Sequence, residues 1–189
     1  MRSLGPRWSA GFTGSARSST YDNFKLSASL KPAIEYDVFP YAESSKRSLT
    51  VQYAMGPSWY EYHELTIFDK LKETRVKHSL SASLGLRQPW GTASASASFS
   101  QTITAPDQYR ASVYGSVNVR VFKGFSVNGS IGYDRIRDQF YLEKAGATEE
   151  EILLRLRQLA TGYSFRANVG FSYSFGSLSN ATVNPRFGG

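Results

Sequence analysis

Two histidines, His63 and His78, are the only side chains in this chain that could serve as an imidazole acid or base. Hydrolytic chemistry needs a nucleophile, a base and a group that orients the base. Ser58, Glu61 and Glu64 lie near His63, but serine is so common here that such neighbours are expected by chance. No spacing marks a catalytic site, so the sequence predicts no enzyme.

Cofactor and metal chemistry lack sequence signals as well. The chain has no cysteine, which excludes disulfides and thiolate metal sites. It shows no glycine-rich phosphate loop, no histidine pair at helical spacing and no acidic calcium loop. We therefore expect no cofactor and no bound metal.

The amount and distribution of charge argue against one class of partner, nucleic acid. The 22 Lys and Arg against 15 Asp and Glu give a formal net charge of +7. The basic residues are spread along the chain instead of forming one patch, which argues against nucleic-acid binding. The mean hydropathy is −0.35, and no apolar run approaches the roughly 18 residues of a membrane-spanning helix.

The clearest structural signal is strict alternation over residues 163–175. Every second side chain there is apolar, and those between are small or polar, a pattern typical of a β-strand with two different faces. Aromatic residues lie at both ends of the run and smaller ones in the middle, as in strands that cross a bilayer. The apolar positions are Tyr163, Phe165, Ala167, Val169, Phe171, Tyr173 and Phe175.

The same period of two predicts eight strands in all. Pro32 should interrupt the ladder of the second strand, and turns are expected at residues 88–91 and 123–124. Longer connections fall at residues 60–75 and 135–161, and the mixed charges of residues 61–77 suggest a solvated loop. The expected strands cover residues 8–17, 23–38, 47–60, 76–87, 92–103, 109–122, 125–133 and 163–175.

Charged residues separate cleanly from the apolar positions of these strands. No charge occupies a central position on an apolar face, where it would cost about 2–4 kcal/mol at mid-bilayer. We therefore expect an all-β, antiparallel, up-and-down transmembrane β-barrel of about eight strands over residues 1–175, with a polar interior. The interior network or pore lining would consist of Arg17, Lys25, Lys31, Glu35, Asp37, Arg87, Arg110, Arg120, Asp134 and Arg166.

Two segments lie outside this strand pattern. Thr148 and Glu151 form a capping box ahead of leucines at helical spacing, which predicts a short helix within residues 147–160. Residues 176–189 read as a polar C-terminal tail. A soluble β-sandwich or ligand-binding barrel is the alternative fold, since apolar faces could pack on each other.

Several segments resemble a group of uncharacterised outer-membrane β-barrel proteins of Gram-negative bacteria, related to the salt-induced outer-membrane proteins. The resemblance is carried by residues 87–91 (RQPWG), 120–124 (RVFKG), 155–161 (RLRQLAT), 173–177 (YSFGS) and 184–187 (NPRF). It implies an outer-membrane location and brings no known substrate. Members of the group carry additional sequence before the point that matches residues 2–6, which implies that eight strands is a minimum.

The expected role is a structural barrel or a narrow, passive, anion-preferring pore. Outer-membrane lipid, lipopolysaccharide and the barrel assembly machinery are the expected partners. An eight-stranded barrel is barely wider than its own side chains, so a packed polar interior is favoured over an open one. The alternative function is a lipid hydrolase or acyltransferase of the outer leaflet that uses His63 or His78.

Overall fold

The computed structural model consists of one antiparallel β-sheet, and it describes residues 2–138, 140–141, 150, 153 and 162–175. In this part of the chain one 3-10 turn, η1 (Tyr41–Glu43), lies between β-strands. Among the described residues, no helix has the length and apolar character needed to cross a membrane. The strands are β1 (Arg2–Ser3), β2 (Trp8–Ser19), β3 (Phe24–Asp37), β4 (Arg47–Tyr62), β5 (Lys72–Gln88), β6 (Gly91–Thr102), β7 (Ala105–Phe122), β8 (Phe125–Ile136) and β9 (Tyr163–Tyr173).

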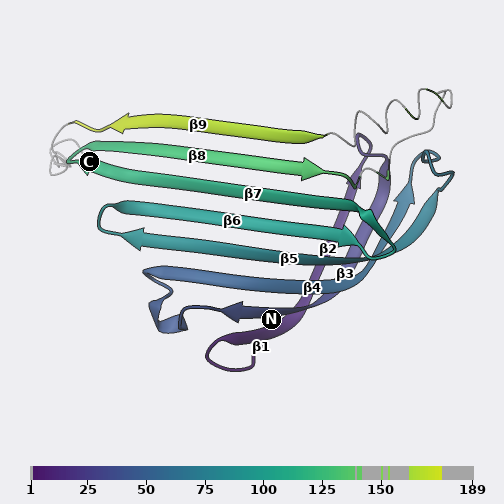
Figure 1. Ribbon diagram of the computed structural model, residues 1–189, viewed down its shortest axis with the longest axis horizontal. Coiled ribbons are helices and arrows are strands. Elements are labelled where there is room, and N and C mark those ends of the chain that lie inside the picture. Colours follow the sequence, from purple (N-terminus) through teal and green to yellow (C-terminus); the bar gives the residue numbers. More distant parts are fainter. Residues whose placement is uncertain (1, 139, 142–149, 151–152, 154–161, 176–189) are drawn as a thin grey trace, which may run out of the picture.

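Each strand pairs only with its neighbours in the chain, so the sheet is up-and-down throughout. β4 to β9 run side by side, whereas β2 and β3 cross their direction steeply at one end, which gives the sheet a marked curl (Figure 1). The sheet is not closed, because β9 pairs with β8 alone among the described residues. The all-β, antiparallel, up-and-down prediction is therefore confirmed, and a closed barrel stays a prediction.

The strands reverse direction at two opposite ends of the sheet. We call the end with the β3–β4, β5–β6 and β7–β8 connections the turn end. The opposite end carries the β2–β3, β4–β5, β6–β7 and β8–β9 connections, and we call it the loop end. The predicted turns at residues 88–91 and 123–124 both lie at the turn end, as expected for tight hairpins.

Strand register aligns the apolar positions of neighbouring strands. Leu80 lies opposite Phe99, Ala97 opposite Val113, and Ile131 opposite Ala167. Side chains at directly opposed positions project from the same side of a sheet, so these residues form one continuous apolar face. Serine pairs such as Ser94–Ser116 mark the other side, the polar face.

The predicted strand boundaries hold to within a few residues, with two differences. β1 lacks a sequence signal because it contains only two residues. β5 begins at Lys72 and β7 at Ala105, earlier than the apolar alternation suggested. Both extensions lie at the loop end and carry polar residues on both sides, which hides the period of two.

Two irregularities in β3 follow from its sequence. As predicted, the β3–β4 pairing is interrupted around Pro32, between Ser29 and Ala33, because proline has no backbone N–H to donate. A second irregularity lies between Phe24 and Leu26, where the register shifts by one residue. The shift corrects the expectation that Phe24 shares the apolar face, since Phe24 pairs with Tyr62 on the polar face.

The predicted helix and the tail lie almost entirely outside the described residues. Apart from Glu150 and Leu153, residues 147–160 lie outside the described residues, and so does the whole segment 176–189.

Candidate functional site

Register places nine of the ten predicted interior residues on the polar face. β2 and β3 contribute Arg17, Lys31, Glu35 and Asp37, β5 contributes Arg87, and the remaining four come from β7 to β9: Arg110, Arg120, Asp134 and Arg166.

Lys25 behaves differently from the other nine. It lies in the bulge between Phe24 and Leu26, and its ammonium is 2.8 Å from Glu61 Oε1. Glu61 pairs with Leu26 and Lys72, so this ion pair sits with the apolar-face side chains at the loop end.

The buried core of the described residues lies on the polar face at the loop end, where charged and aromatic side chains meet. We call this group the loop-end cluster. Its members come from β3, β4, β5, β7 and the segment after β8, and they are Phe24, Tyr60, Tyr62, Glu73, Arg75, Lys77, Arg110, Asp138, Phe140 and Tyr141.

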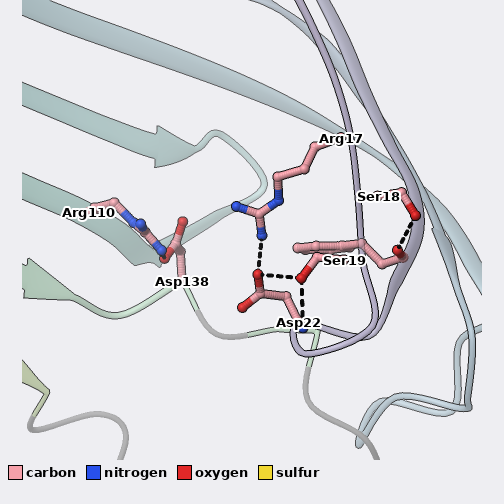
Figure 2. Close-up of polar contacts among 7 residues, drawn as sticks. Arg17, Ser18, Ser19, Asp22, Arg110 and Asp138 are labelled. Atoms are coloured by element: carbon pink, nitrogen blue, oxygen red, sulfur yellow. Dashed lines mark hydrogen bonds and ion pairs between the residues drawn. The ribbon is translucent and has the colours of Figure 1, made fainter.

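Asp138 supplies the central negative charge of the cluster. Arg110 donates to Asp138 Oδ1 from Nη2 at 3.1 Å and from Nε at 3.3 Å. Lys77 Nζ lies 3.5 Å from Asp138 Oδ2. Asp138 is 8% exposed, and a buried carboxylate is tolerated only when it is paired in this way. Figure 2 shows the Arg110–Asp138 pair in the same view as Arg17 of β2 and Asp22 of the β2–β3 connection.

Phe140 packs into the cluster beside two cations. Its ring is 2% exposed and meets the Tyr60 ring edge-on at a centroid distance of 5.0 Å. Arg75 Cζ lies 4.1 Å and Lys77 Nζ 4.6 Å from the Phe140 centroid. Such cation–π contacts strengthen when they are desolvated, so Phe140 contributes both packing and charge stabilisation.

A polar chain along β4, β5 and β7 completes the cluster. Tyr62 donates its hydroxyl hydrogen to Glu73 Oε1 at 2.6 Å. Arg75 donates from Nη1 to Gln108 Oε1. Arg75 Nε also lies 2.8 Å from Glu73 Oε2, an ion pair that does not have hydrogen-bond geometry.

Asn23 joins three connections at this end. Its side-chain amide donates to the carbonyl oxygens of Glu64 and Tyr141, at 3.0 Å and 3.2 Å, and its Oδ1 accepts from the Glu64 amide at 2.8 Å. The residue has a φ of 57°, a left-handed conformation that asparagine tolerates better than most residues.

The Tyr141 side chain packs against the buried aromatic rings of the loop-end cluster. This burial raises the pKa of the Tyr141 phenol above its usual range.

The polar face is less filled at the turn end. A hollow of ≈ 330 Å³ lies there, with Ser48, Gly85, Arg87, Thr92 and Ser94 among its lining residues. These are mostly small or polar side chains. Arg87 is the lining residue that also belongs to the predicted interior set.

The two histidines are not brought together. His78 lies on the apolar face of β5, where it pairs with Met55, approaches the Tyr53 and Phe99 rings and hydrogen-bonds Gln101 at 3.1 Å. His63 follows β4, eight residues along the chain from Met55, which is roughly 26 Å of strand at about 3.3 Å per residue.

Sequence reasoning missed most of the loop-end cluster. The charges of residues 61–77 were interpreted as a solvated loop, but Glu73, Arg75 and Lys77 lie in β5 with largely buried side chains. A signal for a strand was available in the sequence, since Glu73, Arg75 and Lys77 occupy every second position and would lie on one face of a β-strand. Asp138 and Phe140 had no such signal, because they follow the last residue of β8.

Among described residues, no group of three or more His, Cys, Asp or Glu side chains could hold a metal ion. A scan of the chain against protein-family models finds no match, and neither do searches among curated proteins and solved structures.

Proposed function

We propose that this chain is a transmembrane β-barrel of the bacterial outer membrane, with a structural role or a role as a narrow, passive, anion-preferring pore. The single observation that carries the proposal is the continuous apolar face. Its side chains are strongly exposed across the sheet, from Phe12 in β2 at 70% to Val169 in β9 at 73%. A protein in water rarely exposes an apolar patch of this extent, whereas a bilayer would cover it.

Aromatic side chains at both ends of the apolar face support a membrane-spanning orientation. Trp8 and Tyr36 pack at 4.7 Å near the turn end, where Phe125 and Phe171 also stack at 6.2 Å. Aromatic girdles flank the apolar band of outer-membrane barrels in this way.

Strand length agrees with a bilayer span. The 11 residues of β9 cover roughly 33 Å at about 3.3 Å per residue. A tilt of about 40° reduces that to roughly 25 Å, the height of the apolar band of such barrels. At the loop end, Tyr133 and Tyr163 stack at 6.2 Å. They lie eight residues along β8 and β9 from the Phe125–Phe171 pair, which is roughly 20 Å across the bilayer at the same rise and tilt.

The polar face supports a preference for anions. Of the predicted interior residues, register places six basic side chains there, Arg17, Lys31, Arg87, Arg110, Arg120 and Arg166, and three acidic ones, Glu35, Asp37 and Asp134. An excess of one charge sign on low-dielectric walls raises the local concentration of counter-ions.

Single-channel conductance tests the proposal. The full chain is refolded in detergent, folding is checked by the heat-dependent gel shift of intact barrels, and the protein is placed in a planar bilayer. The pore role predicts steady steps with a reversal potential that favours anions. A folded but silent protein would contradict the pore and leave the structural role.

A charge reversal sharpens the test. Arg120→Glu should shift the reversal potential toward cations, because Arg120 is on the polar face opposite Ser126. Lys123→Glu makes the same charge change in the neighbouring β7–β8 turn and serves as the matched control. Equal selectivity in the two variants would contradict anion selection by the polar face.

A further inference from the structure

We infer that Lys77 and Arg110 form a binding site for a small oxyanion at the loop end of the polar face, and that Asp138 fills this site as a tethered anion. The inference deepens the proposed anion-preferring pore and rests on it for the role of the site. The contacts that define the site come from β5, β7 and the segment after β8.

The Asp138 carboxylate is held as a free oxyanion would be. One oxygen accepts from two nitrogens of Arg110, at 3.1 Å and 3.3 Å, and the other faces the Lys77 ammonium at 3.5 Å. Guanidinium and ammonium groups are also the preferred protein ligands of phosphate. The donors are therefore suited to any small oxyanion of similar size.

Positive charge remains in excess around the site. Arg75 and Lys31 both act electrostatically on Lys77, in addition to Asp138. Lys77 lies opposite Gly56 in the register, and a Cβ at position 56 would come within 2.9 Å of Lys31 Cα. The close approach of β3 and β4 at this glycine keeps Lys31 near the site. Three carboxylates, those of Glu73, Asp138 and Asp134, do not balance the four cations Lys31, Arg75, Lys77 and Arg110.

Enclosure distinguishes this site from a surface ion pair. The side chains of Asp138 and Lys77 are 11% and 12% exposed, and Phe140 covers Lys77 from one side, whereas the Arg110 side chain is 44% exposed and forms the open side of the site. Exposed ion pairs are weak and screened by salt, whereas partly buried charges are screened much less. An anion that reaches the site therefore competes with Asp138, whose tether gives it an effective concentration on the order of millimolar.

The test removes the tethered charge and supplies a free one. Asp138→Asn keeps the size of the side chain and leaves Lys77 and Arg110 without their carboxylate. Isothermal titration of the refolded full chain with inorganic phosphate should show at least tenfold tighter binding to Asp138→Asn than to the wild type. Adding Lys77→Gln to Asp138→Asn should abolish that gain.

Asp107→Asn is the matched control, since it makes the same change at an exposed position of β7. It should bind phosphate as the wild type does. Equal phosphate affinity in wild type and Asp138→Asn, or a gain that survives Lys77→Gln, would overturn the inference.

Loss of a buried counter-charge can also prevent folding. If Asp138→Asn gives no heat-dependent gel shift when refolded in chloride, phosphate in the refolding buffer should restore it, because phosphate replaces the missing charge. Failure of that rescue would overturn the inference as well.

The binding test and the pore test fail separately. Calorimetry does not require an open pore, so phosphate binding by Asp138→Asn in a silent barrel would reject the pore and keep the site. A conducting wild type whose Asp138→Asn variant neither binds phosphate nor is rescued by it would keep the pore and reject the site.

Discussion

Val117 and Asn118 are chain neighbours whose side chains lie on opposite faces of β7. Val117 pairs with Ala93 and Gly129 on the apolar face, and Asn118 pairs with Thr92 and Asn128 on the polar face. If the apolar face contacts lipid, the Val117 side chain faces lipid and the Asn118 side chain faces the polar interior, although their backbones are adjacent.

Arginine at each position separates a membrane barrel from a soluble sheet. Val117→Arg should lower the free energy of unfolding by about 2–4 kcal/mol in lipid vesicles, the cost of a lipid-facing charge near the midplane. Asn118→Arg, the control, should change it by less than about 1 kcal/mol. Urea titration followed by tryptophan fluorescence measures both. Similar small effects, within about 0.5 kcal/mol as for exposed sites in water, would favour the soluble alternative.

Phe140 is the most buried ring of the loop-end cluster, and its removal should be costly. Phe140→Ala should destabilise the chain by about 3 kcal/mol, because it loses a buried ring and two cation–π contacts. Tyr21→Ala removes a side chain that is 96% exposed and should cost less than about 0.5 kcal/mol. The same urea titration measures both, and equal costs would mean that Phe140 does not stabilise the fold.

At the scale of the element, the β7–β8 turn shows why glycine is required. Gly124 has a φ of 84°, its carbonyl accepts from the Ser174 amide at 2.7 Å, and a Cβ would lie 2.4 Å from the Ser174 oxygen. Gly124 therefore contacts Ser174, the residue after β9, through backbone atoms, and a side chain at position 124 would separate the two.

Alanine at Gly124 should weaken this junction. A non-glycine residue in a left-handed conformation costs about 1–3 kcal/mol, and the clash adds loss of the Ser174 hydrogen bond. Gly124→Ala should lower the unfolding free energy by at least that amount, whereas Gly5→Ala, with nothing within 4 Å of its Cβ, should be nearly neutral. Amide hydrogen exchange at Ser174 reports the junction directly; unchanged protection would contradict its disruption.

The strands could be predicted from the sequence because the period of two depends only on local side-chain order. The bulge beside Phe24 could not, since a one-residue register shift leaves the apolar pattern intact on paper while it moves Phe24 to the other face. The loop-end cluster was hidden for a different reason. Asp138 lies in the segment after β8 and contacts Lys77 of β5, three strands away, and local side-chain order does not encode a contact between such distant positions.

At the scale of the whole molecule, the main unsolved problem for a membrane location is the unpaired backbone at the outer edges of β2 and β9. β9 has an edge of 11 residues, and β1 pairs with β2 only at Ser9 and Ala10. Unpaired backbone groups cost several kcal/mol each in a bilayer, and open edges recruit other strands. In the bilayer we expect β2 and β9 to pair antiparallel, which the eight strands β2 to β9 permit.

Engineered cysteines test this closure, and the absence of native cysteine makes the assay clean. Cys at Ser15 on the polar face of β2 is combined in turn with Cys at Ser164, Asn168 or Ser172 on the polar face of β9. One pair should form an intramolecular disulfide in vesicles, detected by non-reducing gel and mass spectrometry. Crosslinks between two molecules would show that a second copy completes the sheet, and no crosslink would contradict closure by these strands.

Pairing between chain neighbours alone makes hairpins interchangeable units. Duplicating or deleting one hairpin at the gene level leaves every remaining strand with a valid partner, so the circumference can change without a new topology. The contact between Asn23 and Tyr141 spans 118 positions and is the kind of link that such a change would break. The Asn23–Tyr141 hydrogen bond therefore ties the number of intervening strands to the geometry of the loop end.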